Sequence, residues 1–353
     1  MMSFRGGRLH NFAVPAGTVW LMTEIAEAKG RQELYAKQSP QVLKALLEMA
    51  LVQSVESSNR IEGVTVEPAR LRPLVLGNSR PRDRSEQEIQ GYRRALNLIH
   101  TGSSNLRITP DTIRRLHRII QEGGGDAGQW KRADNEIVEL RAGGPPIIRF
   151  RPLSAIATPA AVEELCLSYR HALDQENVPA LLADAILVFD FLCIHPFRDG
   201  NGRASRLLTL LALYHHGYEV GRYVSLERLV EESREDYYAV LQESSMGWHE
   251  GQHDFVPWLN YFLSVLRRAY REFEERAGQV KSPRGAKTTL VEAAIEAFPA
   301  EFNLTDIERA CTGVSRDMVR RVLRELQKAN KVVCLGRGPG ATWRKEGNTL
   351  KRG

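Results

Sequence analysis

The feature that most constrains how this chain folds is its most apolar window, Ala180–Ile194. Asp184 and Asp190 interrupt this window, and it is shorter than the roughly 18 uninterrupted apolar residues that a membrane span requires. We therefore expect it to form a buried helix of a soluble protein.

The remaining composition is that of a cytoplasmic globular protein with more than one domain. A chain of 353 residues is too long for one ordinary compact domain. Its 42% hydrophobic and 26% charged residues exclude disorder, collagen and coiled coil as descriptions of the whole chain. The four cysteines stand singly, which argues against zinc ribbons and disulfide frameworks and favours a reducing compartment. The start, Met1–Val14, lacks the apolar core of a signal peptide, so no membrane partner is expected.

Helical patterning dominates the first 276 residues. Amphipathic spacing and helix-start signals predict helices over 41–55, 85–99, 109–122, 158–174, 179–194, 203–216, 226–243 and 254–276. Between Gly123 and Pro152, glycines and prolines separate two short stretches, Glu136–Leu140 and Ile147–Phe150. That pattern predicts a β-hairpin with a long tip.

The last part of the chain changes character after a polar segment, Ala277–Lys287, which is typical of a linker. Helices are predicted over 289–298, 305–310 and 315–329, followed by strands over 332–335 and 341–344 around a Gly-rich tip, 336–340. Three helices and a two-stranded wing predict a winged helix-turn-helix domain.

The string from His195 to Arg203, directly after the apolar window, has the composition of an anion site. Gly200, Asn201 and Gly202 can turn several backbone N–H groups inward at the start of the next predicted helix. A helix N-terminus also attracts phosphate. Arg203 and Arg206, three residues apart on one helix face, add two positive charges with bidentate geometry.

Two further residues give this string its chemistry. Asp199 supplies a hard oxygen ligand suited to a Mg²⁺ ion that bridges phosphates. His195 is the group here that can take a proton near neutral pH. Taken singly, a Gly-Asn-Gly turn is common and a lone histidine after an apolar helix is usually structural. The conjunction favours a nucleoside polyphosphate site with a general base beside it.

Residues 195–203, His-Pro-Phe-Arg-Asp-Gly-Asn-Gly-Arg, resemble the signature of the Fic-domain family (Fic/DOC) at every position. The resemblance covers roughly residues 41–275. It includes the predicted hairpin, which resembles the family's target-docking flap, and the continuation Ser225–Tyr238. It implies a mainly helical fold and, for most members, transfer of AMP from ATP to a hydroxyl of a protein side chain.

The resemblance also implies roles for the individual residues of the motif. His195 would deprotonate the incoming Ser, Thr or Tyr hydroxyl, and Asp199 would hold Mg²⁺ on the α- and β-phosphates. Residues 200–202 would cradle the bridge between those phosphates. Arg203 would bind the β-phosphate and Arg206 the γ-phosphate. Transfer to the α-phosphorus with pyrophosphate leaving in line suits such an array.

A second element upstream resembles the family's inhibitory helix. It consists of Ser58, three intervening residues, Glu62 and Gly63. By that resemblance Glu62 would pair with Arg206, and a carboxylate–guanidinium pair is strong enough to compete for that arginine. The plain alternative is a helix C-terminus with a solvated Glu62 and Gly63 as the left-handed cap.

Two other features have a functional and a structural interpretation. Tyr237 and Tyr238 would stack near the adenine, or else belong to the core of an amphipathic helix. The hairpin Arg132–Arg151 would bind an extended target segment through its edge, or simply close the pocket. The family's Pro-rich exit from the flap is reduced here to Arg151-Pro152-Leu153, which leaves the register of the flap open.

The mild basic excess of the chain is concentrated at its C-terminal end. Residues 285–353 hold 13 Lys or Arg against 8 Asp or Glu, a net charge of +5, which leaves +1 for the first 284 residues. Five of these arginines fall on the predicted recognition helix or the wing tip: Arg316, Arg320, Arg321, Arg324 and Arg337. That distribution favours binding of duplex DNA by 288–353 over protein docking.

The sequence thus predicts a mainly α protein in four parts. These are an N-terminal helical region with the inhibitory helix (1–100), a Fic catalytic core (101–276), a linker (277–287) and a winged helix-turn-helix domain (288–353). The expected activity is Mg²⁺-dependent transfer of AMP from ATP to a protein, including itself, restrained by Glu62. The alternatives are a DNA-binding regulator whose Fic domain senses ATP, and a Fic enzyme that removes AMP or uses another nucleotide. A homodimer is compatible with the sequence.

Overall fold

The computed structural model describes residues 3–38, 40–77, 79–139, 147–279, 288, 291–292, 294–295, 301–311, 314–336 and 341–345. The chain divides into two compact units, Met1–Ala277 and Gly278–Gly353, which are described separately. Several predicted features lie outside the described residues. They are the tip of the hairpin (140–146), most of the linker (280–287), most of the helix predicted over 289–298, and the wing tip with Arg337 (337–340).

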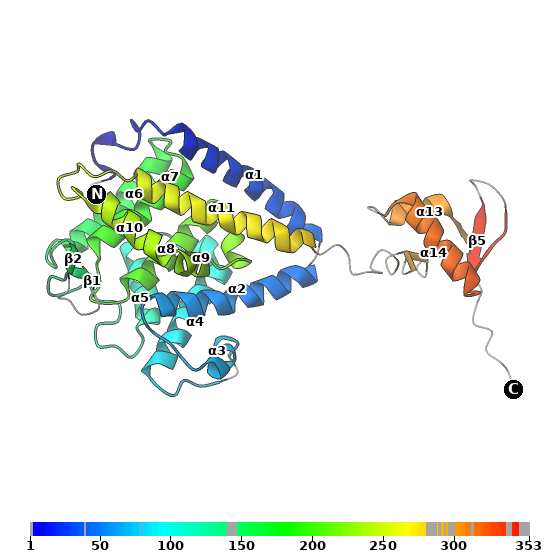
Figure 1. The fold of residues 1–353 in the computed structure, drawn as a ribbon, viewed down its shortest axis with the longest axis horizontal. Helices are drawn as coiled ribbons and strands as arrows, with labels where there is room; N and C mark the ends of the chain where they lie inside the picture. Colours follow the sequence, from blue (N-terminus) through cyan, green and yellow to red (C-terminus); the bar gives the residue numbers. More distant parts are fainter. Residues whose placement is uncertain are drawn as a thin grey trace. The chain divides into compact units, whose positions relative to one another are not determined.

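The first unit is mostly helical (Figure 1). Its helices are α1 (Ala16–Gln38), α2 (Pro40–Ile61), α3 (Pro68–Val75), α4 (Arg84–Gly102), α5 (Pro110–Ile120), α6 (Thr158–Asp174), α7 (Ala180–Ile194), α8 (Asn201–His215), α9 (Leu226–Glu232), α10 (Arg234–Ser245) and α11 (Val256–Gln279). Strands β1 (Ile137–Glu139) and β2 (Ile147–Phe150) pair antiparallel as the predicted hairpin, with a register shift after Ile137.

Helix α7 is the centre of this unit. Every residue from Leu181 to Ile194 is buried, which confirms the helix predicted from the apolar window. Each of its two carboxylates accepts a hydrogen bond inside the core: Tyr169 donates to Asp184 at 2.7 Å, and the Trp248 indole N–H donates to Asp190 at 2.7 Å. Helices α6 and α8 pack on α7, so the chain that leaves α7 turns back into α8 against the core. Among the described residues, no helix is both long and apolar enough to cross a membrane.

The structure of the first unit differs from the predicted elements in several places, and helix α3 was not predicted. The helix predicted over 226–243 is two helices, because Ser233 leaves helical geometry and its hydroxyl bonds to the carbonyl of Leu229. Helix α8 begins at Asn201, two residues earlier than predicted. Helix α1 was not predicted: it buries Ile25 but exposes Trp20, so its apolar residues do not form one stripe.

The second unit contains a three-stranded antiparallel sheet and two described helices. The order of the sheet is β3 (Glu301–Asn303), β5 (Thr342–Lys345) and β4 (Val332–Cys334), with helices α13 (Leu304–Ala310) and α14 (Arg316–Lys328) between β3 and β4 in the sequence. Helix α14 buries one apolar face, made of Val319, Val322, Leu323 and Leu326. Strand β3 was not predicted, and it pairs with β5 along the edge opposite β4.

Candidate active site

The predicted motif forms the tight connection between α7 and α8. His195 ends α7 in a left-handed conformation (φ 51°), and its backbone N–H donates to the carbonyl of Phe191 at 3.0 Å. Gly200 precedes α8 with φ 78°, a backbone angle that glycine adopts without steric cost. This connection therefore places the backbone N–H groups at the start of α8 beside the histidine that ends α7.

Asn201 holds this connection closed from within. Its side-chain Oδ1 accepts from the backbone N–H of Phe197 at 2.9 Å, and its Nδ2 donates to the carbonyl of the same residue at 2.8 Å. The Phe197 ring is fully buried and stacks on the imidazole of His117 with ring centroids 3.7 Å apart. Both polar atoms of the Asn201 side chain thus stabilise the loop. Only the backbone N–H of Asn201 is available for the predicted binding of phosphate.

His117 of α5 supports the same connection. Its Nδ1 accepts from the backbone N–H of Gly128 and its Nε2 donates to the carbonyl of Asp199, both at 2.9 Å. This pairing requires a neutral imidazole, since a backbone N–H can only donate. Burial lowers the pKa of His117, which keeps it in that form.

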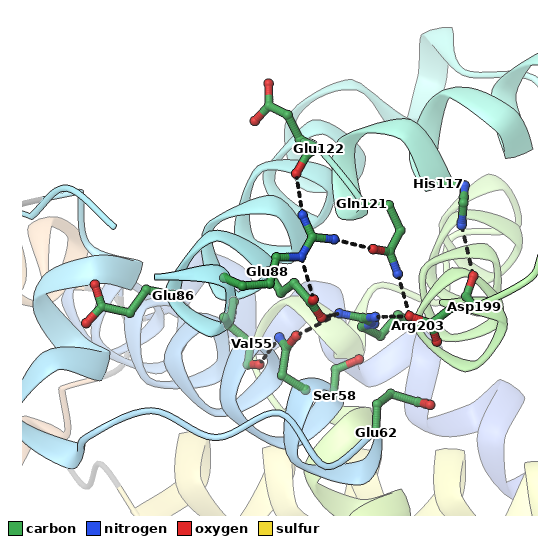
Figure 2. Close-up of polar contacts among 12 residues, drawn as sticks. Val55, Ser58, Glu62, Glu86, Glu88, His117, Gln121, Glu122, Asp199 and Arg203 are labelled. Atoms are coloured by element: carbon green, nitrogen blue, oxygen red, sulfur yellow. Dashed lines mark hydrogen bonds and ion pairs between the residues drawn. The ribbon is translucent and has the colours of Figure 1, made fainter. Parts of the chain in front are cut away.

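Arg203 lies almost completely inside the protein, with 1% of its side chain exposed. Its Nη1 donates to Glu88 Oε2 at 2.5 Å and to Asn59 Oδ1 at 3.4 Å, and its Nη2 lies 3.5 Å from Asp199 Oδ2 (Figure 2). Its Nε is buried without a hydrogen-bond partner among the described residues. The guanidinium is therefore anchored on one side by α2 and α4 and directed on the other toward Asp199.

Arg206 contacts the predicted inhibitory segment at the end of α2. Its Nε donates to the Ser58 hydroxyl and its Nη2 to the Ser58 carbonyl, each at 2.8 Å. The same Nη2 donates to Glu62 Oε1 at 2.8 Å, and 25% of the Glu62 side chain is exposed. The third nitrogen, Nη1, is buried and has no hydrogen-bond partner within the described part of the chain.

The carboxylate of Glu62 also lies directly over the turn that begins α8. A Cβ atom built on Gly202 would collide with Glu62 Oε1, so a larger residue at this position would require the Glu62 side chain to move. Gly63, with φ 78°, lets the chain turn away immediately after Glu62. Gly63 has the left-handed angle of a helix cap, as the plain alternative expected, but Glu62 is ion-paired with Arg206, which that alternative did not expect.

The surroundings of His195 favour the neutral form that a general base requires. Its Nδ1 lies 3.3 Å from the carbonyl of Leu192, which can only accept, so the ring proton belongs on Nδ1 and Nε2 carries the lone pair. Burial lowers the pKa of His195 to about 4, and the nearby ammonium of Lys131 acts in the same direction. Lys131, which the sequence did not single out, donates to the carbonyl of Ile194 at 3.1 Å.

This shift predicts the pH dependence of a reaction that uses His195 as base. A histidine with the ordinary pKa of about 6.5 keeps only about a quarter of its neutral form at pH 6. Because the pKa of His195 is about 4, its neutral form predominates at pH 6 as well as at pH 8. We expect the transfer rate of a Glu62→Gly variant, at saturating ATP and Mg²⁺, to stay level from pH 8 to pH 6. A fourfold fall over that range would contradict the shifted pKa.

The two predicted adenine-stacking tyrosines lie in different surroundings. Tyr237 is buried against Trp258 and Tyr261, and together with Arg206 these residues line a cavity of ≈ 50 Å³. Tyr238 is half-buried, with the guanidinium of Arg149 from β2 5.6 Å from its ring centroid. Tyr237 therefore belongs to the core beside Arg206, whereas Tyr238 lies next to the hairpin.

Asp199 is suited to hold a metal ion together with phosphate oxygens. Its side chain is 69% exposed, beside the N-terminus of α8. Nowhere in the described part of the chain do three or more His, Cys, Asp or Glu gather into a metal site of their own. Mg²⁺ is commonly bound by one or two carboxylates, substrate phosphates and water, so a single exposed carboxylate at an anion site fits that ion.

Comparison with known proteins agrees with this geometry. The Fic/DOC family pattern matches residues 107–213. The proteins named protein adenylyltransferase fic-1 from Caenorhabditis briggsae and Caenorhabditis elegans are 24% and 25% identical over 208 and 205 residues. The matched stretches cover 57% and 56% of this chain but 36% and 35% of those proteins. The chain thus spans about a third of the length of the curated relatives it matches.

A solved structure shares the fold. The crystal structure of a Fic family protein from Desulfovibrio desulfuricans G20 superposes with a TM-score of 0.62 at 22% sequence identity, covering 95% of this chain and 98% of that one. The family match includes the whole of the motif from His195 to Arg203. This chain thus contains a Fic domain, matched over residues 107–213, and has the fold of a solved Fic family protein.

Proposed function

We propose that this protein transfers AMP from ATP to a hydroxyl of a protein side chain, including its own. The observation that supports the proposal is the tight connection between His195, whose Nδ1 faces the Leu192 carbonyl, and the N-terminus of α8, which suits an anion. Two buried arginines, Arg203 and Arg206, border that site, and each has a guanidinium nitrogen without a hydrogen-bond partner among the described residues. Such nitrogens suit phosphate oxygens, which accept from several donors at once.

In the proposed reaction, Nε2 of His195 takes the proton of the target hydroxyl. The hydroxyl oxygen forms a bond to the α-phosphorus of ATP while the bond from that phosphorus to the bridging oxygen breaks, and pyrophosphate leaves with that oxygen. Backbone N–H groups of 200–202 and the two arginines neutralise charge on the phosphates. Asp199 would hold Mg²⁺, which when bound supplies positive charge to the α- and β-phosphates.

We further propose that Glu62 keeps the enzyme in a resting state. Its carboxylate pairs with Arg206 and lies over Gly202, where the N–H groups of α8 would receive phosphate. A γ-phosphate and this carboxylate compete for the same guanidinium, and like charges cannot share the site. ATP bound beside Glu62 would hold its α-phosphate out of line with the attacking hydroxyl.

The reaction class is tested by comparing ATP labelled at the α-phosphate with ATP labelled at the γ-phosphate, using the Glu62→Gly variant and Mg²⁺. Transfer of AMP attaches the α-label to protein and releases the γ-label in pyrophosphate. Attachment of the γ-label alone would identify a kinase and refute the proposal. Mass spectrometry of the product then distinguishes AMP from another nucleotide.

Two other activities predict different results in the same assay. A Fic domain that only senses ATP would bind it and label no protein with either form. A domain that removes AMP would release label from pre-modified protein with Glu62 present and lose that activity in Glu62→Gly, if Glu62 orients the attacking water. The neutral His195 favours the transferase over the sensor, because binding ATP does not require a base.

For the second unit, we propose a separate function in binding duplex DNA. The specific observation is the exposed face of α14, which opposes its buried apolar face and presents Arg320, Arg321 and Arg324. The nearest acidic partners lie on the same helix: Asp317 is 3.7 Å from Arg320 and Glu325 is 3.8 Å from Arg321. Exposed pairs of this kind are weak, so the arginines remain available to phosphate.

The DNA proposal predicts salt-sensitive binding of the full chain to duplex DNA. Each arginine that binds a phosphate should contribute about 0.9 to the slope of log K against log salt. Replacing Arg320, Arg321 and Arg324 together by glutamine should therefore weaken binding and flatten that slope. The control replaces three exposed arginines of the first unit: Arg72, Arg94 and Arg267. Equal weakening in both triple variants, or no binding at low salt, would favour a protein-docking role.

A further inference from the structure

A closed ring of hydrogen bonds joins Arg203 and Asp199 through three residues of α4 and the end of α5 (Figure 2). Glu88 Oε2 accepts from Arg203 at 2.5 Å, and Glu88 Oε1 accepts from Arg84 Nε at 2.9 Å. Arg84 Nη2 donates to Gln121 Oε1 at 2.7 Å. Gln121 Nε2 donates to Asp199 Oδ2 at 2.9 Å, and Arg203 Nη2 faces that same oxygen at 3.5 Å. The family signature contains Arg203 and Asp199 but none of the three connecting residues.

The direction of the Gln121 amide follows from the ring. A guanidinium can only donate and an ionised carboxylate can only accept. The amide oxygen must therefore face Arg84, which leaves the amide NH₂ for Asp199. Arg84 is itself held in place, because its Nη1 donates to the carbonyl of Glu122 at 2.9 Å.

Gln121 is placed to act on Asp199 although it comes from a different helix. Only 5% of Gln121 is exposed, whereas 69% of the Asp199 side chain is exposed. A Cβ atom built on Gly200 would meet Gln121 Nε2 at 3.0 Å, so the amide also lies against the turn of the anion site. The buried amide of Gln121 thus holds Oδ2 of the otherwise exposed Asp199 carboxylate. Arg203 Nη2 faces the same oxygen.

We propose that Gln121 is a positioning residue for the metal-binding carboxylate of Asp199, with its amide oriented by Arg84. This inference rests on the proposed function, in which Asp199 holds Mg²⁺ beside the phosphates of ATP. Partners that orient a metal ligand typically change metal affinity by about 10- to 100-fold when they are removed. We expect an effect of this size here because the ring fixes Asp199 relative to Arg203, which in the proposed function binds the phosphates of the same ATP.

The test measures ATP binding by calorimetry at a series of Mg²⁺ concentrations and in EDTA, with every variant made in the Glu62→Gly background. Gln121→Met keeps the size of the side chain and removes both hydrogen bonds. We expect the Mg²⁺ concentration that gives half of the metal-dependent gain in affinity to rise about tenfold, with ATP affinity in EDTA unchanged. A fall in EDTA affinity as large as the fall with Mg²⁺ would assign Gln121 to the shape of the turn and overturn the proposal.

A double-mutant cycle tests whether the effect passes through Asp199. Gln121→Met should change the Mg²⁺ dependence in the parent and leave it unchanged in an Asp199→Asn background. Additive effects of the two substitutions would overturn the proposal. If Asp199→Asn itself left the Mg²⁺ dependence unaltered, the proposed metal site would fail instead, so the two failures are distinguishable.

The role of Arg84 is tested with a closely matched control. Arg84→Met should free the Gln121 amide to flip and raise the half-effect Mg²⁺ concentration by less than Gln121→Met does. Arg94→Met removes another arginine of α4 with the same 44% exposed side chain, whose partner is Glu122 rather than Gln121. We expect no change in Mg²⁺ dependence for Arg94→Met, and equal changes in both arginine variants would contradict the role given to Arg84.

Discussion

Replacing Glu62 by glycine is expected to raise the rate of self-labelling with AMP by about 10- to 100-fold. The physical reason is the charge-assisted contact between Glu62 and Arg206, at 2.8 Å and partly shielded from water. Contacts of this kind contribute about 1.5–3 kcal/mol, which corresponds to that range of rates if ATP must displace the carboxylate to react. The measurement is the initial rate of incorporation of α-labelled AMP at fixed ATP and Mg²⁺.

Two companion variants separate charge from flexibility in that result. Glu67→Gly removes an exposed acid five residues further on, at the N-cap of α3, where glycine is tolerated. It should label at the parental rate. Glu62→Gln keeps the shape of the side chain and removes its charge, so its rate should lie between those of the parent and Glu62→Gly. A Glu62→Gly variant no faster than the parent would show that residues 58–63 do not restrain the enzyme.

Replacing His195 by alanine in the Glu62→Gly background should lower the labelling rate by about 100- to 10,000-fold, the usual contribution of a general base. ATP binding should persist, because the proposed anion site consists of α8 N–H groups and arginines and does not include the imidazole. The rate and the ATP dissociation constant are therefore measured on the same preparation. Loss of both would indicate that His195 holds the fold of the connection instead.

His171→Ala is a suitable control for this substitution. His171 is a surface histidine of α6, with 62% of its side chain exposed. Its replacement should leave both the labelling rate and the melting temperature unaltered. If the His195→Ala variant melted at a much lower temperature than this control, the reduced rate would be a consequence of unfolding.

The local parts of the site could be predicted because they are contiguous in the sequence. The left-handed turn at Gly200, the start of α8 to within two residues, and the spacing of Arg203 and Arg206 all follow from residues within one short string. The buried helix that positions this string could be predicted for the same reason, since its apolar side chains are consecutive. The domain boundaries and the roles assigned to the motif residues stay predictions.

The connections between distant segments could not be predicted from one sequence. His117, Gln121 and Glu88 have no local pattern that marks them, and they reach the motif only because α4 and α5 pack beside α8. The break at Ser233 was equally invisible, since the residues on either side keep helical spacing. The spacing of apolar residues reports which face of a helix is buried, but not which other helix covers it.

The sequence by itself therefore determined the class of fold, the motif from His195 to Arg203 and the unequal charge of the two parts of the chain. Only the tertiary structure decided which side chains from other segments contact this motif. It places Glu62 on Arg206 and over Gly202, and it joins Arg203 and Asp199 through a ring of partners from α4 and the end of α5. The reason is physical: backbone turns and helix periodicity act between near neighbours, whereas ion pairs and buried hydrogen bonds join any groups that folding brings within about 3 Å.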